Sequence, residues 1–102
     1  MIDVLITKDS IEVIGHAGAA EPGRDLVCAA VSTVTFMLVN LIDCIRDKLE
    51  ECEIETKSGY TKVRYVAKEE YEDILRAQLE VIKIGFYMVA SRYEQFVSVK
   101  DI

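Results

Sequence analysis

The sequence has 102 residues, of which 51% are hydrophobic and 29% are charged, and its formal net charge is −6. This length fits one domain, residues 1–102, with a single core, and the composition is that of a globular chain rather than a disordered one. The acidic balance argues against direct contact with nucleic acid, because phosphate contacts need clustered Lys and Arg.

The amino-terminal segment and the cysteines indicate the cellular setting. The segment shows no secretory signal, because Asp3 lies in it and no long apolar region follows. The three cysteines, Cys28, Cys44 and Cys52, cannot all pair within one chain, and they are too few and too dispersed for a disulfide framework or a C-x-x-C metal site. We therefore expect reduced thiols in a cytoplasmic protein, with no metal and no cofactor.

The first predicted elements are two short strands and a loop. Residues 1–7 alternate weakly between apolar and polar positions, and a second alternating segment, residues 11–13, follows a polar turn, which predicts a hairpin. Residues 15–24 hold three glycines and the only proline, and this composition predicts a loop. Asp25 is then predicted to be the N-cap of a helix, because its carboxylate can accept amide hydrogens of the first turn.

The predicted helix runs from about residue 26 to about residue 50, and its first half is apolar on nearly all sides. Polar residues interrupt residues 26–42, whose length is at the short edge of a membrane span, so we predict a buried core helix and no membrane partner. From Asp43 onward the helix becomes amphipathic, with Ile45 and Leu49 facing inward. A helix that is apolar all round must be covered all round, so we expect part of it to meet a second subunit.

The second half of the chain predicts another hairpin and another helix. Strands at residues 52–57 and 60–67 flank a tight turn at Gly59. Helical period returns over residues 68–95, and Gly85 within it indicates close packing against a neighbour. Strand positions predicted to face inward include Ile54, Val63 and Tyr65. The apolar positions that recur at helical spacings of three and four are Tyr71, Ile74, Leu75, Leu79, Ile82, Phe86, Met88 and Val89.

Together these elements predict an α+β fold of two layers. Their order is β-β-α-β-β-α, to which residues 96–99 can add a short terminal strand. The two hairpins then form a mostly antiparallel sheet packed by two long helices.

The acidic residues gather in two segments, residues 43–55 and residues 69–73. Such runs are commonly the solvated faces of helices and strands. They can also attract a basic partner through their electrostatic field. The sequence leaves both interpretations open.

The residues able to carry out chemistry are concentrated in residues 15–32, which hold the only histidine, His16, and the first cysteine, Cys28. With Asp25 as the N-cap, Cys28 would lie in the first turn of the helix, where the thiolate is favoured. His16 could take the thiol proton and return it to a departing amine. Asp25, Cys28 and Ser32 are spaced by three and four residues, so they share one stripe, and Asp25 or Ser32 could orient the pair.

The same helix end allows other interpretations. The amides of Cys28 and Ala29 would be free to stabilise an oxyanion, or the glycines before the helix could cradle a phosphate. A phosphate site lacks support, because neither G-x-x-x-x-G-K-[ST] nor G-x-G-x-x-G is present and only Arg24 lies nearby. Cys28 could also be a buried packing residue. The residue types alone leave catalysis and packing open.

The order of residues within this segment resembles a known family. The chain reads G-H-A, then a loop closing on G-x-D, then L-V-C-A-A-V-S. This string resembles the ribosomal-processing cysteine protease family Prp, also called the YsxB-like family. The resemblance spans most of the chain, and its specific part is residues 15–32.

The resemblance implies an activity and a site. Members of the family are bacterial cysteine endopeptidases that remove a short N-terminal extension from the twenty-seventh large-subunit ribosomal protein, before or during ribosome assembly. The family's nucleophile falls on Cys28 and its histidine on His16, with the accompanying acid and serine on Asp25 and Ser32. The resemblance also implies a homodimer.

A second function from a different class fits the same residues. The chain could be a non-catalytic ribosome-assembly module that binds a basic ribosomal protein through its acidic surface. In that case Cys28 would serve packing alone, and its thiol would react no faster than the other two.

Overall fold

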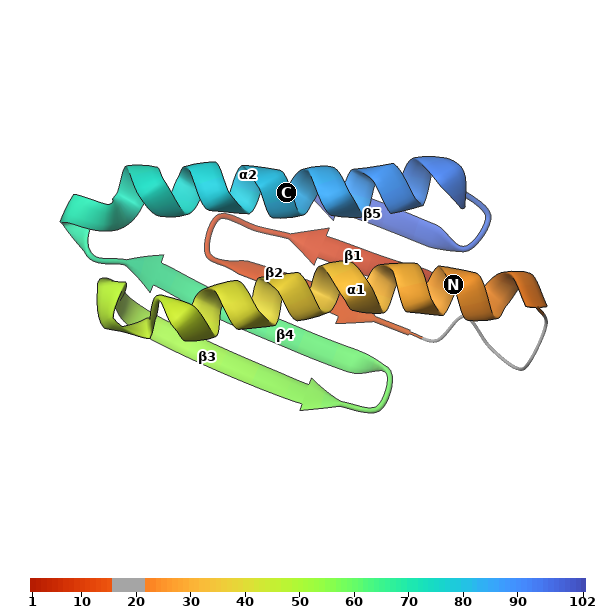
Figure 1. Cartoon of the computed structure of the whole chain (residues 1–102), viewed down its shortest axis with the longest axis horizontal. Coiled ribbons are helices and arrows are strands. Elements are labelled where there is room, and N and C mark those ends of the chain that lie inside the picture. The colour runs from red at the N-terminus through yellow and green to blue at the C-terminus, as the bar shows by residue number, and fades with distance from the viewer. Residues whose placement is uncertain (16–21) are drawn as a thin grey trace.

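The structure of the protein is a computed structural model that describes residues 1–15 and 22–102, with side chains described for residues 1–15 and 26–102. Two short 3-10 helices, Arg46–Lys48 and Glu69–Tyr71, each lie directly before a longer element. The main elements, labelled in Figure 1, are β1 (Ile2–Ile6), β2 (Ser10–Ile14), α1 (Pro22–Cys44), β3 (Leu49–Lys57), β4 (Tyr60–Ala67), α2 (Glu72–Arg92) and β5 (Val97–Asp101).

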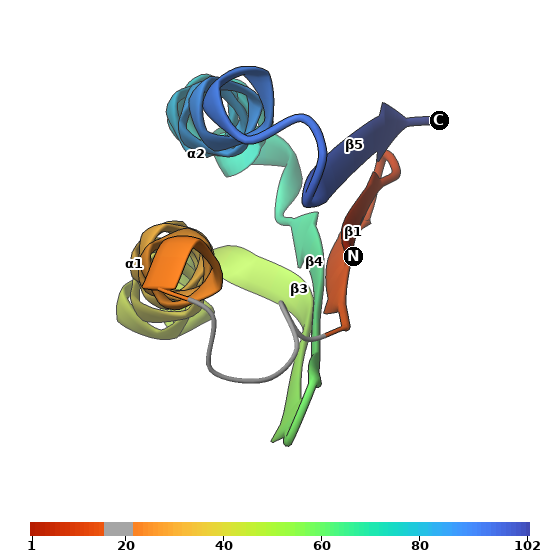
Figure 2. The same ribbon diagram turned by 90° about the vertical axis from the view of Figure 1, so that its right-hand side faces the viewer.

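The strands form one five-stranded sheet in the order β3-β4-β2-β1-β5. Its neighbouring strands are antiparallel except for β1 and β5, which run parallel. Both helices cover the same face of the sheet, as Figure 2 shows with the sheet seen from its edge. The predicted two-layer α+β fold with a mostly antiparallel sheet is confirmed, and the terminal strand is present as β5.

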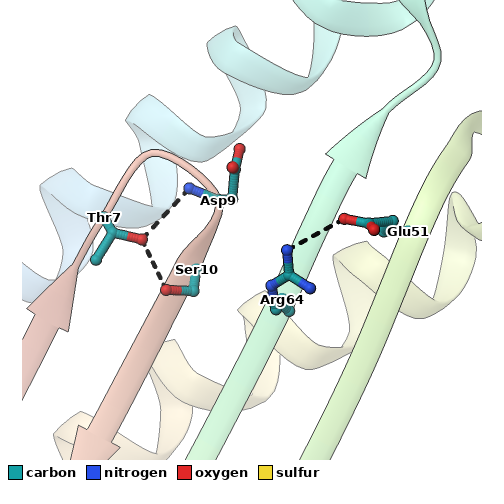
Figure 3. Close-up of polar contacts among 5 residues, drawn as sticks. All are labelled: Thr7, Asp9, Ser10, Glu51 and Arg64. Atoms are coloured by element: carbon teal, nitrogen blue, oxygen red, sulfur yellow. Dashed lines mark hydrogen bonds and ion pairs between the residues drawn. The ribbon is translucent and has the colours of Figure 1, made fainter.

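Local polar groups and glycine shape the two hairpin turns. Between β1 and β2 the Thr7 hydroxyl accepts a 3.4 Å bond from the backbone N–H of Asp9 and lies 2.7 Å from the Ser10 hydroxyl (Figure 3). Between β3 and β4 the turn places Gly59 at a φ of 72°, in the left-handed region that glycine adopts without strain. Both turns close the strands tightly enough to fix their registers.

The core lies between the sheet and the helices. Each helix contributes one stripe at helical spacing, which is the pattern expected of a helix packed on one side. Buried residues of α1 are Val27, Val31, Val34, Thr35, Leu38 and Ile42, and those of α2 are Leu75, Leu79, Ile82 and Phe86.

The two helices approach each other closely at Gly85. A Cβ atom at this position would lie 3.0 Å from Cγ1 of Val34 on α1. Gly85 therefore admits the Val34 side chain, and the close packing predicted from a glycine inside the helix is confirmed.

The boundaries of α1 differ from the prediction at both ends. The helix begins at Pro22, so Asp25 lies inside it and is not the N-cap. Proline is favoured at the first helical position because its φ is already helical and its missing N–H would have no partner there. The helix ends at Cys44 rather than near residue 50, and Leu49 is the first residue of β3.

Two of the apolar positions that follow the helical period of α2 are exposed in the structure. Ile74 is 53% exposed and Met88 is 65% exposed. The sheet lies on only one side of the helix, so fewer positions of α2 are buried than are apolar in the sequence. Apolar side chains on the outer side of α1, among them Leu26, Phe36 and Met37, are likewise exposed, as expected for a helix that the domain cannot cover alone.

One helix segment in the described part of the chain, Leu26–Cys44, is long and apolar enough to cross a membrane by length and composition, with a mean hydropathy of 1.9. A core helix of a soluble protein passes the same test, so this is weak evidence. In the structure this segment packs its valine and leucine stripe against the sheet.

Candidate active site

A pocket lies between the first half of α1 and the end of the sheet where β2 stops and the β3–β4 hairpin turns. Its volume is about 220 Å³. The apolar part of its lining is formed by Ile2, Val13, Val31 and Phe36. Cys28, Ser32 and Thr35 line it from α1, and Gly15, Lys57, Gly59, Tyr60 and Thr61 line it from the strand ends.

Cys28 is held at the edge of this pocket by the residues beside it on α1. Val27 and Val31 are buried against the sheet, which sets the rotation of the helix. Cys28, one position after Val27, is half-buried and packs against the core while it lines the pocket. Ser32, one turn later, is exposed and lines the same pocket. The predicted stripe therefore brings Cys28 and Ser32 together.

The other thiols in the described part of the chain lie elsewhere. Cys44 is exposed at the last residue of α1, and Cys52 is half-buried in β3. Neither lines the pocket around Cys28. Across residues 1–15 and 26–102 no group of three or more His, Cys, Asp or Glu side chains is arranged to hold a metal ion.

Gly15 sets the direction in which the chain leaves the end of β2. Its φ is +111°, a backbone angle that residues with a side chain rarely adopt. Its N–H donates a 2.9 Å hydrogen bond to the carbonyl of Gly59. A Cβ atom here would collide with the carbonyl oxygen of Met1. Gly15 directly precedes His16, so the residue before the predicted base lines the same pocket as Cys28.

His16 lies outside the described residues. The backbone of Asp25 is part of α1, but its side chain lies outside the described part of the structure. The structure therefore describes two of the four predicted site residues, Cys28 and Ser32, and places both at one pocket.

The start of α1 changes the predicted electrostatics of the site. Cys28 follows Pro22 by six residues, so it lies beyond the first turn, to which the effect of the helix dipole is largely confined. The amides of Cys28 and Ala29 face the carbonyls of Arg24 and Asp25 within the helix and are not free. The prediction that these two amides form an oxyanion site is wrong, because the free N–H groups of a helix lie in its first turn, and Cys28 and Ala29 come after it.

The tip of the β3–β4 hairpin supplies a wall that sequence reasoning missed. Tyr60 donates its hydroxyl to Oε2 of Glu12 at 2.9 Å, and this bond raises the pKa of Tyr60. The ammonium of Lys57 lies 5.2 Å from the Tyr60 ring centre. The turn at Gly59 was predictable, but its position beside Cys28 depends on β4 pairing with β2, which no local pattern reveals.

Comparison with known proteins identifies relatives across the chain. Residues 1–98 match the family described as cysteine protease Prp. The ribosomal processing cysteine protease Prp of Bacillus subtilis is 36% identical over 70 residues, which cover 69% of this chain and 62% of that protein, less than two thirds of its length. The protein of the same name from Mycoplasma pneumoniae is 28% identical over 101 residues, covering 99% of this chain and 95% of that one.

Solved structures share the whole fold. The essential ribosomal processing protease Prp of S. aureus, in complex with a covalently linked product peptide, aligns over 100% of both chains with a TM-score of 0.79 and 26% identity. The protein SMU.848 from Streptococcus mutans aligns over 99% of this chain and 91% of its own, with a TM-score of 0.74 and 29% identity. The resemblance predicted from residues 15–32 and the predicted enzyme class, a cysteine protease, are confirmed at the level of the family.

The role of Gly15 is tested by comparing it with the other glycine of positive φ. Gly15→Ala should lower the free energy of unfolding by more than Gly59→Ala, since each substitution imposes strain of about 1–3 kcal/mol, but only the first adds a collision with the Met1 carbonyl. Denaturant unfolding of both variants measures the difference. Equal losses would show that the close approach of Met1 places no demand on Gly15.

Proposed function

The chain belongs to the cysteine protease Prp family, and on that premise we propose that it is the endopeptidase that removes the N-terminal extension of the twenty-seventh large-subunit ribosomal protein during ribosome assembly. The observation that carries this proposal is the pocket that Gly15, Cys28 and Ser32 line together. A half-buried thiol at the rim of an open pocket can meet an extended peptide. The printed names of the relatives, ribosomal processing proteases, support the substrate class.

The proposed reaction is acyl transfer to Cys28. The thiolate attacks the carbonyl carbon of the scissile bond, and His16 takes the thiol proton and passes it to the departing amine. Water then attacks the thioester, giving the carboxylate product and regenerating the thiol. Gly15 lines the pocket and directly precedes His16 in the sequence, which supports His16 as the base.

Asp25 and Ser32 are proposed as supporting residues. Ser32 lies one helical turn after Cys28 and lines the pocket, so its hydroxyl is available to the substrate or to the imidazole. Asp25 precedes Cys28 by three positions in the same helix, which puts the two on one stripe. Either residue can orient His16 as the third member of a triad does.

Charge supports a basic protein as the substrate. The edge strand β3 carries exposed Glu51, Glu53 and Glu55 on one face. Glu51 pairs with Arg64 and Glu55 with Lys57, and Glu53 has no ion-pair partner in the described part of the chain. Ribosomal proteins are generally basic because they contact RNA phosphates, and an acidic surface raises the encounter rate with such a partner. The same surface would serve a non-catalytic assembly module, which is the second candidate function. We further propose that the protein acts in the cytoplasm, where ribosomes assemble.

A homodimer is proposed through the outer face of α2, rather than through the outer side of α1, where the sequence predicted the contact with a second subunit. Its exposed apolar residues repeat at the alternating spacings of three and four that two packed helices use. They are Ile74, Ala77, Val81, Ile84 and Met88. This apolar stripe runs along most of the helix with no partner in the described part of the chain, and a second copy offers the same stripe for pairing.

Replacing the nucleophile tests the enzymatic mechanism. Cys28→Ala should lower cleavage of the organism's own ribosomal protein, carrying its native extension, by at least about a thousandfold, because no other thiol lines the pocket to form the thioester. Mass analysis of the product measures this loss. Alanine suits a helix interior, so the circular dichroism spectrum should not change.

Matched variants separate the nucleophile from the other thiols. Cys44→Ala and Cys52→Ala should cleave at close to the wild-type rate, because neither thiol lines the pocket. Cleavage by Cys28→Ala at the wild-type rate would contradict the mechanism. A substrate left intact by an enzyme that cleaves other peptides would contradict only the substrate assignment.

Thiol alkylation distinguishes a protease from an assembly module. A cysteine activated by His16 should react with iodoacetamide faster than Cys44, although Cys44 is the more exposed. If Cys28 serves packing alone, it should react more slowly than Cys44, because Cys28 is less exposed. Mass spectrometry of labelled peptides gives the order, and His16→Ala should reverse it if the imidazole activates the thiol.

Light scattering after size exclusion tests the dimer. Ile84→Asp should convert the protein to a monomer, because it puts a charge in the middle of the apolar stripe of α2. Met37→Asp, which places the same charge on the exposed side of α1, should leave a dimer. A monomeric wild-type protein would rule out the dimer, and the reverse pattern for the two variants would move the interface to α1.

A further inference from the structure

A hydrogen bond between two side chains joins β2 to β4 beside the pocket of Cys28. Tyr60, the first residue of β4, donates its hydroxyl to Oε2 of Glu12 on β2 at 2.9 Å. Among the described residues it is the one side-chain hydrogen bond between these two strands. The acyl transfer proposed above gives neither residue a role.

This bond runs diagonally across the β2–β4 pair. Tyr60 is directly opposite Ile14, and Glu12, two residues before Ile14, is directly opposite Lys62. An aromatic side chain is long enough to reach such a diagonal neighbour. The Glu12 carboxylate is thus bonded to a phenol rather than to the lysine opposite it. A planar ring with few rotatable bonds is held in one place by such a bond, whereas a lysine has a long flexible stem.

The Tyr60 ring also has a contact from β3. The ammonium of Lys57 lies 5.2 Å from the ring centre and 3.6 Å from Oε1 of Glu55. Lys57 is 65% exposed, and contacts of such an exposed charge contribute little. The bond to Glu12 is the stronger hold on the ring, because a hydrogen bond to a charged acceptor is of the strong kind.

The bond holds a part of the sheet that has little other support. β3 is an edge strand, so within the sheet only β4 attaches the β3–β4 hairpin to the other strands. The turn of this hairpin is bonded to β2 at two points. One is the backbone bond from Gly15 to the carbonyl of Gly59, and the other is the side-chain bond from Tyr60 to Glu12. Gly15, Gly59 and Tyr60 all line the pocket of Cys28.

We propose that Glu12 and Tyr60 are positioning residues for the cleavage reaction, because their hydrogen bond holds the hairpin turn in place as a wall of the pocket that Cys28 lines. This inference rests on the proposed function, in which Cys28 attacks a peptide carbonyl. The wall limits how the scissile peptide can lie against the thiol. A small misplacement of the reacting groups lowers the rate strongly even when the substrate still binds.

Steady-state kinetics with the organism's own ribosomal protein test this role. Tyr60→Phe and Glu12→Ala should each lower kcat about tenfold and change KM by less than about threefold, because binding is retained while the carbonyl is less well placed. Iodoacetamide should still label Cys28 at close to the wild-type rate, because this small reagent needs no pocket wall. A loss that spared the thiol and the KM in this way would not arise from a general loss of folding.

Three further variants show whether the bond itself is responsible. Glu12→Gln keeps a carbonyl that accepts from the phenol and should retain at least about half of the wild-type kcat. The double variant of Tyr60→Phe with Glu12→Ala should be no slower than the slower single variant, since both changes remove one bond. Arg64→Gln, the matched control, breaks the 3.1 Å bond to Glu51 within the same hairpin but away from the pocket, and should leave kcat unchanged.

Four results with an active wild-type enzyme would overturn this proposal alone. They are a wild-type kcat for Tyr60→Phe, an equal loss for Arg64→Gln, a Glu12→Gln variant as slow as Glu12→Ala, and losses that multiply in the double variant. A wild-type protein that does not cleave the ribosomal protein would overturn the proposed function, and this inference with it.

Discussion

The rotation of α1 on the sheet is the constraint on which the candidate site depends. Val27 and Val31 must face the sheet, because they are among the most buried side chains of the core. Successive helical residues are about 100° apart, so Cys28 and Ser32 then lie on the flank of the helix, at the edge of the layer. A rotation that buried Cys28 fully would expose Val27. The same apolar contacts that stabilise the fold therefore keep the thiol at the pocket.

The predictions succeeded where a pattern is local and failed where two local signals compete. The alternation of apolar and polar residues was enough to predict both hairpins. Helical spacing alone was enough to predict that Cys28 and Ser32 lie on one stripe. The start of α1 was misplaced because Asp25 is a good capping residue in isolation, whereas Pro22 is favoured at the first position of a helix. Choosing between them requires knowing where the chain enters the helix layer, which depends on tertiary packing.

The end of α1 was misplaced for a related reason. Leu49 lies seven positions after Ile42, a spacing that continues a helical stripe. It equally begins the alternation of β3, where it pairs with Ala67. Pairing within the sheet makes Leu49 part of β3, because β3 pairs with β4 along the whole length of β4. The wall of the pocket at Lys57 and Gly59 was invisible to sequence analysis on the same grounds, since long-range pairing sets its place.

Polar side-chain atoms rarely enter the core between the sheet and the helices, because a buried polar group without a partner costs free energy. Three residues with hydroxyls are buried in the described part of the chain: Ser10, Thr35 and Tyr65. Ser10 bonds to Thr7, and Thr35 donates to the carbonyl of Val31 at 2.8 Å. Only the Tyr65 hydroxyl has no partner, although phenylalanine would fill the same space without a polar atom to desolvate. Since an unpaired buried polar group costs free energy and a small domain has little stability to spare, this hydroxyl is the one buried hydroxyl of the described residues that opposes the stability of the core.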